Sequence, residues 1–598
     1  MRYIFLIILF FFRLNSFSQP TVSELNNLAF EYYYNGNFEK AKSTYEDLYK
    51  KTKSKYYFNY YINCFKKLNQ NNEAIKILKS QVKHNPKDLS FRVMLGDFYN
   101  SAGYNDKAKS EFETAIKKMP DNRDKIINLA NSFIQIKEYD YAERVYLKGE
   151  KMLKMPFNFE LASLYQIKRD YKKMIEKYLD VLDYSPSFLQ SIQNRLQYTV
   201  YNNDDGTIKQ QLKTGLIRRI QKKSNNTVYN ELLIWLYLQD KDYDNALTQT
   251  IAIDKRLNEN GYRVLQIGNI ALANKNYKVA IRAFEYITEK YKKSRYYFTA
   301  KNKLLESRFK SLISDTYTKK DLIYIRDEYK KSLAEMGRNS ETYDAIIQLS
   351  KIEAFYLNNI QDAQNELTNA LKFKNLTPQQ LAKIKIALAD ILLLKNNFWD
   401  ATLYYAQVEE QFKNNPIGYQ AKFKKAKLAF YSGDFKWAQA QLDILKASTS
   451  KLISNDAFEL SKLISDNLNN EDTNTTPLKM YSQADLLFYR NKDSLAILKL
   501  DSIIEKYPAN SIIDESLFLK AKILLHDKKF KQAIINLQKV AETYSYDILA
   551  DNALYLLAKT YINKLNNKQK AKEYYKKLVL EHSDSIYAPE ARKFLNKN

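Results

Sequence analysis

The feature that most constrains this chain is a small residue that recurs every 33 or 34 positions in its N-terminal part. The recurring positions are Ala41, Ala74, Ala108 and Ala142, and four residues after them stand Tyr45, Leu78, Phe112 and Tyr146. A fixed period of this length is typical of a solenoid of stacked helical hairpins. The chain holds only 11 Gly and 10 Pro and shows no run of strict apolar alternation between turns, which argues against a sheet.

The same phase continues through most of the chain. Further copies centre on Met174, Ala246, Ala280, Ala363, Ala401, Ala438, Ala496, Ala533 and Ala571. The intervals 174–246, 280–363 and 438–496 exceed one period, so each predicts a degenerate hairpin, the first of them near 190–225. We therefore predict an all-α fold, a right-handed α-solenoid of about 15 helical hairpins.

The clearest copy lies between Phe91 and Pro120. Its marked positions are Leu95-Gly96, Tyr99, Gly103, Ala108, Phe112, Ala115 and Pro120. This pattern resembles the tetratricopeptide repeat, although Arg92 or Val93 stands where that family has an early Trp. The small residues Gly96 and Ala108 would let the two helices approach to about 8–10 Å. Pro120 would end the unit, because proline cannot continue a helix interior.

A short motif opens the second helix of several copies. A polar turn is followed by an aromatic residue, two mostly polar residues and the phased alanine, as in Phe38–Ala41, Tyr277–Ala280 and Phe530–Ala533. We expect the aromatic residue to pack at the start of the second helix and to set its entry angle.

Residues 1–18 predict a secretory signal that is not part of the fold. Arg2 precedes an apolar run from Tyr3 to Phe12, and Ser16-Phe17-Ser18 places small residues before Gln19. The run is shorter than the about 20 residues that span a bilayer, and no later segment is long and apolar enough to do so. The sole cysteine, Cys64, is far from the cleavage position, which excludes a lipoprotein. The predicted location is the periplasm.

The formal net charge of +27 has two interpretations. Lysines either cover solvated faces, as the mixture of Lys and Glu around Lys572–Lys577 favours, or they draw the protein to anionic envelope material in a peripheral contact. Nucleic acid would be the usual partner of such a charge, but the export signal argues against it.

The arrangement along the chain predicts three arrays: 19–295, a looser array at 296–468, and 478–598 after a polar linker at 469–477. In the last array, Tyr507-Pro508 and Ala588–Ala591 resemble joints of Tol-Pal-associated and outer-membrane-assembly repeat proteins, although Ser511 comes one residue late. The signal and the Lys, Asn and Tyr enrichment are similar to those of envelope proteins of the Bacteroidetes.

The chain shows no pattern for catalysis, a metal or a cofactor. Its histidines are His84, His526 and His582, and none has a second His or Cys at ligand spacing. Cys64 lacks an identifiable base, so we interpret it as a small apolar residue and His84 as a solvated or capping residue.

Binding positions follow from the family resemblance, which implies that the first helix of each hairpin lines a groove. These positions are Phe30, Tyr33, Tyr34, Asn59, Asn63, Lys66, Asp97, Asn100, Asn131 and Asn269. Asn can both donate to and accept from a peptide backbone, and Tyr offers contact area at low entropy cost. The alternative is that they are ordinary polar positions. The carboxylate clamp of some family members is not matched, because Asn26 and Phe30 stand at its first two positions.

Three functions remain open at this point. The first is a non-enzymatic periplasmic scaffold that binds other envelope proteins or peptides. The second is a holdase-like binder of outer-membrane or secreted clients, and the third is a peptidoglycan- or glycan-associated protein.

Overall fold

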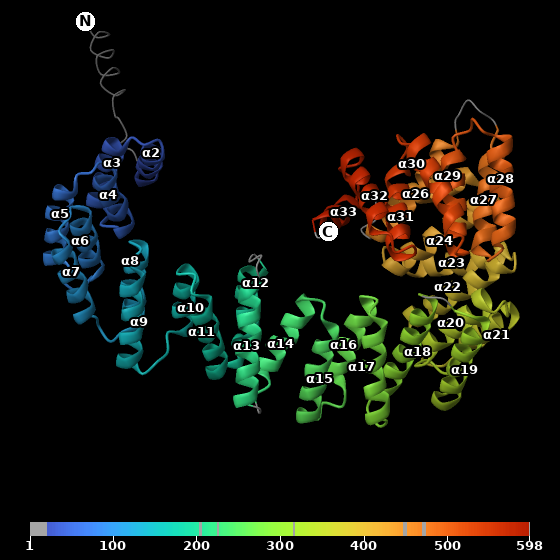
Figure 1. Cartoon of the computed structure of the whole chain (residues 1–598), viewed down its shortest axis with the longest axis horizontal. Coiled ribbons are helices and arrows are strands. Elements are labelled where there is room, and N and C mark those ends of the chain that lie inside the picture. The colour runs from blue at the N-terminus through green and yellow to red at the C-terminus, as the bar shows by residue number, and fades with distance from the viewer. Residues whose placement is uncertain are drawn as a thin grey trace, which may run out of the picture. The chain divides into compact units, whose positions relative to one another are not determined.

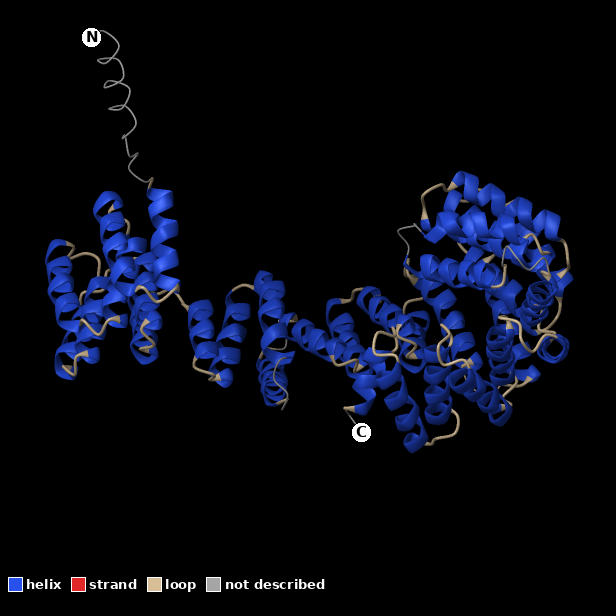
Figure 2. Ribbon diagram, turned by 90° about the horizontal axis from the view of Figure 1, so that it is seen from above, coloured by secondary structure: helices blue, strands red, loops and turns tan. Residues whose placement is uncertain are grey.

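The computed structural model describes residues 21–201, 206–223, 226–314, 317–446, 451–468 and 474–596. The predicted signal at 1–18 lies outside these ranges. Within them every regular element is a helix, and Figure 2 shows helices joined by short loops. The predicted all-α repeat solenoid is confirmed. None of the described helices is long and apolar enough to cross a membrane.

The chain forms two compact units, residues 1–253 and 254–598, and the boundary falls within α15 (Tyr243–Leu257). The predicted array limits at 295 and 468 concern repeat regularity and stay predictions. Figure 1 shows the order of the helices along each unit.

Unit 1 is built from consecutive helix pairs. Its helices are α2 (Val22–Tyr34), α3 (Phe38–Thr52), α4 (Lys55–Lys67), α5 (Asn71–His84), α6 (Ser90–Ser101), α7 (Asn105–Lys117), α8 (Arg123–Gln135), α9 (Tyr139–Leu153), α10 (Asn158–Ile167), α11 (Tyr171–Tyr184), η1 (Pro186–Phe188), α12 (Leu189–Tyr201), α13 (Thr207–Lys222), α14 (Val228–Gln239) and the first part of α15. The pair α12 and α13 is the divergent hairpin predicted near 190–225.

Unit 2 continues the pairing. Its further helices are α16 (Tyr262–Ala273), α17 (Tyr277–Lys290), α18 (Tyr297–Ile313), α19 (Lys319–Met336), α20 (Tyr343–Lys351), the π-helix η2 (Ile352–Tyr356), α21 (Ile360–Ala370), α22 (Pro378–Leu394), α23 (Phe398–Gln411), α24 (Pro416–Ser432), α25 (Phe435–Lys446), α26 (Lys451–Asp466), α27 (Thr476–Tyr489), α28 (Asp493–Lys506), α29 (Ile513–His526), α30 (Phe530–Thr543), α31 (Ala550–Asn563), α32 (Lys568–Glu581) and α33 (Ala588–Leu595). Over the described residues the helices of both units pair into fifteen hairpins, with α26 and α33 left single.

The phased residues are the packing contacts of the repeat. Each lies in the second helix of its hairpin, and the alanines from Ala41 to Ala571 are at most 1% exposed. A methyl group at this position leaves room for the first helix of the hairpin to come close, which is the role that the sequence predicted. The aromatic of the motif is the first residue of the second helix in α3, α17 and α30.

The turn inside the thirteen hairpins that carry a phased residue adds a feature that the sequence did not reveal. A residue with positive φ stands five positions before each phased residue, whatever its type. These residues are Gly36, Asn69, Gly103, Lys137, Arg169, Lys241, Lys275, Asn358, Asn396, Gly433, Asn491, Lys528 and Asn566. A left-handed residue ends the first helix and aims the chain back along it. The distance from the turn residue to the phased residue is therefore fixed.

Two sequence predictions need correction. The linker predicted at 469–477 is shorter, because Thr476 and Pro477 already open α27, and Pro477 is buried there. Proline suits the first helical turn, where its missing N–H would have no partner; residues 469–473 lie outside the described ranges. The interval 438–496 holds the single helix α26 rather than a hairpin.

Candidate functional site

The predicted binding residues of unit 1 lie on the first helices of successive hairpins. Phe30, Tyr33 and Tyr34 stand on α2; Asn59, Asn63 and Lys66 on α4; Asp97 and Asn100 on α6; and Asn131 on α8. We call these nine residues the first-helix row. Asn269 stands on α16, which belongs to unit 2, so it is not part of this row.

The start of the row is an aromatic cluster. The rings of Phe30 and Tyr34 lie 4.2 Å apart, and Tyr33 contacts Tyr34 at 6.1 Å and Tyr60 of α4 at 5.2 Å. Tyr56, one turn before Tyr60, contacts it at 5.1 Å. Phe30, Tyr34 and Tyr56 are 44%, 68% and 51% exposed, whereas Tyr33 and Tyr60 pack against the core. The sequence did not predict Tyr56 and Tyr60 as members.

The middle of the row is held together by its own charges. The Lys66 ammonium lies 2.8 Å from the Asp97 carboxylate, which joins α4 to α6, and the Asn100 amide donates to Glu138 at 3.4 Å. These predicted ligand contacts therefore pair with neighbouring repeats. An exposed pair of this kind contributes little stability, on the order of 0.5 kcal/mol, but it fixes the register of adjacent hairpins.

Two asparagine side chains in the first two hairpins keep an unused acceptor. The amide oxygens of Asn26 and Asn59, which stand 33 residues apart on α2 and α4, are buried from solvent and have no hydrogen-bond partner in the described part of the chain. A buried acceptor without a donor is costly. Asn63, Asn100 and Asn131 are exposed, and Asn269 is half-buried.

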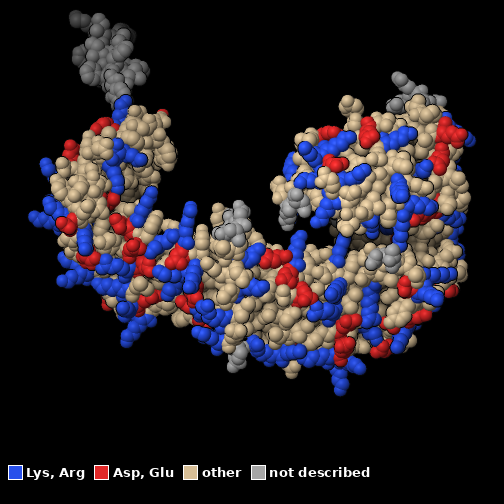
Figure 3. Space-filling model, in the orientation of Figure 1, with Lys and Arg blue, Asp and Glu red and all other residues tan. Residues whose placement is uncertain are grey.

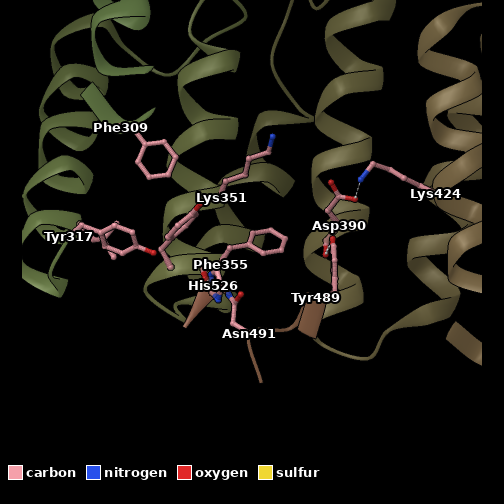
Figure 4. Close-up of a pocket in the computed structure, with 11 residues that line it drawn as sticks. Phe309, Tyr317, Lys351, Phe355, Asp390, Lys424, Tyr489, Asn491 and His526 are labelled. Atoms are coloured by element: carbon pink, nitrogen blue, oxygen red, sulfur yellow. Dashed lines mark hydrogen bonds and ion pairs between the residues drawn. The ribbon is translucent and has the colours of Figure 1, made fainter. Parts of the chain in front are cut away.

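Unit 2 contains a cavity of about 430 Å³ that the sequence did not predict (Figure 4). The residues that line it are Phe309, Tyr317, Leu322, Lys351, Phe355, Tyr356, Asp390, Lys424, Tyr489, Asn491 and His526. They come from α18 to α29, and one wall is the π-helix η2. Turns of π-helix are rare and occur often at functional sites.

The cavity exists because α27 packs back onto earlier repeats. Tyr489 donates to the Asp390 carbonyl at 3.4 Å, and Arg490 donates to the Leu393 carbonyl at 3.1 Å and to Asn396 at 2.5 Å. Asn491 donates to the Phe355 carbonyl. These contacts join residues about a hundred positions apart, so no repeat period predicts them.

Several polar groups around the cavity form hydrogen bonds or ion pairs with other side chains. Asp390 accepts from Tyr405 at 2.6 Å and pairs with Lys424 at 2.7 Å. Burial and the nearby Asp390 raise the pKa of Tyr405 well above its usual value. Burial lowers the pKa of the Lys351 amine, which has no hydrogen bond or ion pair in the part of the chain that the structure describes.

Among the residues that the structure describes, one group has the composition of a metal site. Asp493, His526 and Asp527 hold their ligand atoms within 4.8 Å of one another. However, His526 Nδ1 is already 2.8 Å from Asp493, and Asp527 pairs with Lys529 at 3.0 Å. The hydrogen bond to the Asp493 carboxylate raises the pKa of His526. These pairs account for the cluster as structural contacts.

The remaining candidates for chemistry have structural roles. Cys64 is fully buried, and burial raises the pKa of its thiol to about 12, so the reactive thiolate is scarce. His84 ends α5, with Nδ1 2.8 Å from the Ser80 carbonyl, which agrees with the predicted capping role.

Charge is distributed rather than gathered. On the face drawn in Figure 3, acidic and basic side chains alternate over the helices of each unit. Several pairs join neighbouring repeats, such as Arg144 of α9 with Glu113 of α7 and Lys559 of α31 with Glu590 of α33. This supports the interpretation that lysines cover solvated faces.

Residues 552–585, which include most of α31 and all of α32, match the family model of the tetratricopeptide repeat. This hairpin is similar to a tetratricopeptide repeat. It carries Asn566 in the left-handed turn and Ala571 at the phased position, so the other hairpins share its construction. No curated protein matches the chain.

Three solved structures are similar to the chain at low identity. The Naa15/Naa10 complex bound to HypK-THB is 14% identical, over 96% of this chain and 88% of that one, with a TM-score of 0.27. A tetratricopeptide repeat protein from Parabacteroides merdae is 16% identical, over 50% and 98%, with a TM-score of 0.21. The Cut9–Hcn1 hetero-tetramer of the APC/C is 10% identical, over 97% and 96%, with a TM-score of 0.25. At these scores none is a guide to partners.

Proposed function

We propose that the chain is an exported, non-enzymatic scaffold that binds other envelope proteins in the periplasm through the first-helix row. The repeat architecture is suited to protein binding, because stacked hairpins present one long surface. The periplasmic location rests on the signal pattern at 1–18.

The observation that carries the proposal is the start of the row. There the rings of Phe30, Tyr34 and Tyr56 are exposed, and the Asn63 amide on α4 is exposed as well. Aromatic faces supply contact area, and an exposed amide such as that of Asn63 can donate to and accept from a peptide backbone without regard to its sequence. An extended segment of a partner protein offers both an apolar side and backbone N–H groups.

The test is crosslinking capture from an envelope extract by the mature chain and by the double variant Phe30→Ser with Tyr34→Ser. Capture of a few proteins, lost in this variant, supports the proposal. Tyr184→Ser is the matched control, because Tyr184 is 76% exposed at the end of a second helix. Equal capture by all three chains would contradict it.

Two further assays test the other candidate functions. Weak binding to many unrelated sequences on a peptide array would identify a holdase-like protein. Cosedimentation with peptidoglycan, abolished in the same double variant, would identify a glycan-associated protein. Binding to anionic vesicles that disappears with added salt would reveal the peripheral envelope contact that the charge of +27 suggests.

A further inference from the structure

We propose that the cavity of unit 2 binds a small organic acid, a carboxylate attached to an aromatic or branched apolar body. This inference goes beyond the scaffold function, because it concerns a small molecule and a different unit from the first-helix row. Either can therefore fail without the other.

The charge of the cavity calls for an anion. The carboxylates with the strongest electrostatic effect on Lys351 are Asp390 and Glu306, and each already has a closer cation. Asp390 pairs with Lys424 at 2.7 Å, and Glu306 pairs with Lys303 and Lys310 at 2.8 and 2.7 Å. In Figure 4 the dashed line joins Lys424 to Asp390, and none reaches Lys351. The Lys351 ammonium is thus a surplus positive charge.

The walls call for an apolar body on that anion. Phe309, Tyr317, Phe355, Tyr356 and Tyr489 contribute aromatic rings, and the Phe355 and Tyr489 rings meet edge to face at 5.7 Å. The volume of about 430 Å³ is within the range of small-molecule sites, which are mostly apolar with a few polar groups that fix orientation. A cavity with one unpaired cation and aromatic walls matches an amphipathic acid.

A bound ligand would also stabilise the contacts that α27 makes with α22 and η2. Tyr489 and Asn491 line the cavity and also bind the carbonyls of Asp390 and Phe355. A ligand that contacts both sides stabilises the packing of α27 on η2 and α22, since any ligand that binds only the folded form raises its stability.

The experiment uses a matched pair of probes with the full mature chain. Naphthylacetate carries the carboxylate, and naphthylacetamide has nearly the same shape without the charge. Isothermal titration calorimetry should show naphthylacetate binding about tenfold more tightly than the amide, because a charge-assisted hydrogen bond contributes that much. Equal binding of the two probes, or binding of neither, would overturn the proposal.

Variants locate the site. Lys351→Gln should remove the preference for the acid, whereas Lys522→Gln should keep it. Lys522 is the matched control, since it lies on α29 with its ammonium over the Phe518 ring and outside the cavity lining. Unchanged preference in Lys351→Gln would place the acid elsewhere and contradict the assignment.

A measurement on the wild-type chain avoids dependence on a folded variant. Limited acetylation followed by mass spectrometry reports the reactivity of the Lys351 amine. Naphthylacetate should slow its acetylation several-fold and leave Lys522 unchanged, while equal rates with and without the probe would count against the proposal. Tighter binding of the peptide N-acetyl-Leu-Phe than of naphthylacetate would contradict a small organic acid as the ligand and would indicate the C-terminal carboxylate of a peptide instead.

Discussion

Gly96 of α6 lies directly against the ring of Phe112 on α7, so that a Cβ atom at position 96 would overlap the ring. The same relationship recurs in unit 2, where a Cβ atom at Gly268 would lie 2.6 Å from the Phe284 ring. Phe112 also contacts Phe133 of the next hairpin at 5.4 Å. The ring thus packs inside its own hairpin and against its neighbour.

Gly96→Ala should destabilise unit 1 by about 1–3 kcal/mol, because the added methyl group forces the Phe112 ring from its position. Urea unfolding followed by circular dichroism, with hydrogen exchange of α6, measures this change. The second substitution Phe112→Leu should restore part of the loss by making room for the methyl group. A fully additive double variant would show that the two residues do not interact as described.

One alanine inserted between Gln532 and Ala533 should destabilise the hairpin of α30 by about 3 kcal/mol or more. The insertion turns the rest of the helix by about 100°, which rotates Leu537 and Val540 out of the core, where both are fully buried. The control is the same insertion between Ser545 and Tyr546, in an exposed connection between hairpins. There the melting temperature should hardly change; equal losses at the two places would refute a fixed turn-to-helix distance.

Asp254→Ala should destabilise unit 2 by about 3 kcal/mol or more. The buried Asp254 carboxylate accepts from the Gly261 backbone at 2.8 Å and from the Tyr286 and Tyr291 hydroxyls at 2.9 and 2.5 Å. Removing it leaves the buried Gly261 N–H, the buried Tyr291 hydroxyl and the half-buried Tyr286 hydroxyl without this acceptor. Tyr286→Phe removes the bond to Asp254 and the bond that Tyr286 accepts from Lys290, and it should cost about 1 kcal/mol. The two losses are compared by urea unfolding, and a larger loss for Tyr286→Phe would contradict this ranking.

Glu515→Gln should flatten the dependence of stability on pH. Burial and the hydrogen bond with Asp514 raise the pKa of Glu515 far above its usual value of 4.5, so the folded chain keeps a proton that the unfolded chain releases above about pH 4.5. Wild-type stability therefore falls as the pH rises from there.

Unfolding in urea at pH 5.5 and pH 8 tests this sign. The wild type should lose stability between the two, and Glu515→Gln should lose less and be the more stable chain at pH 8. Asp321→Asn is the control, because the hydrogen bond with the Thr318 backbone lowers the pKa of Asp321 and places its titration below this window. A steeper loss in Glu515→Gln would disprove the assignment.

The repeat could be predicted because it depends on residue size. The phased alanines, such as Ala41 and Ala533, are buried in nearly every hairpin, and the degenerate hairpin near 190–225 exists as α12 and α13. The single helix α26 could not be predicted, because an interval longer than one period, such as 438–496, does not tell whether it holds one extra helix or two.

The candidate sites were less predictable. Lys66 and Asp97 were expected to contact a ligand but pair with each other, a contact that their opposite charges at a spacing of 31 residues could have indicated. The cavity around Lys351 depends on contacts such as that of Asn491 with Phe355, which are 136 residues apart and follow no period. Local pattern carries no information about such contacts.

The left-handed turn has a consequence for how such proteins are recognised. Gly36, Asn69, Lys137 and Arg169 all stand at this turn position, so the backbone conformation is the same in these hairpins while the residue type differs. A chain that has Lys or Asn at these turns can thus lack the glycine that a sequence comparison would match and still keep the same fold. A search that compares dihedral angles rather than residue types should recover relatives that share no recognisable ancestry.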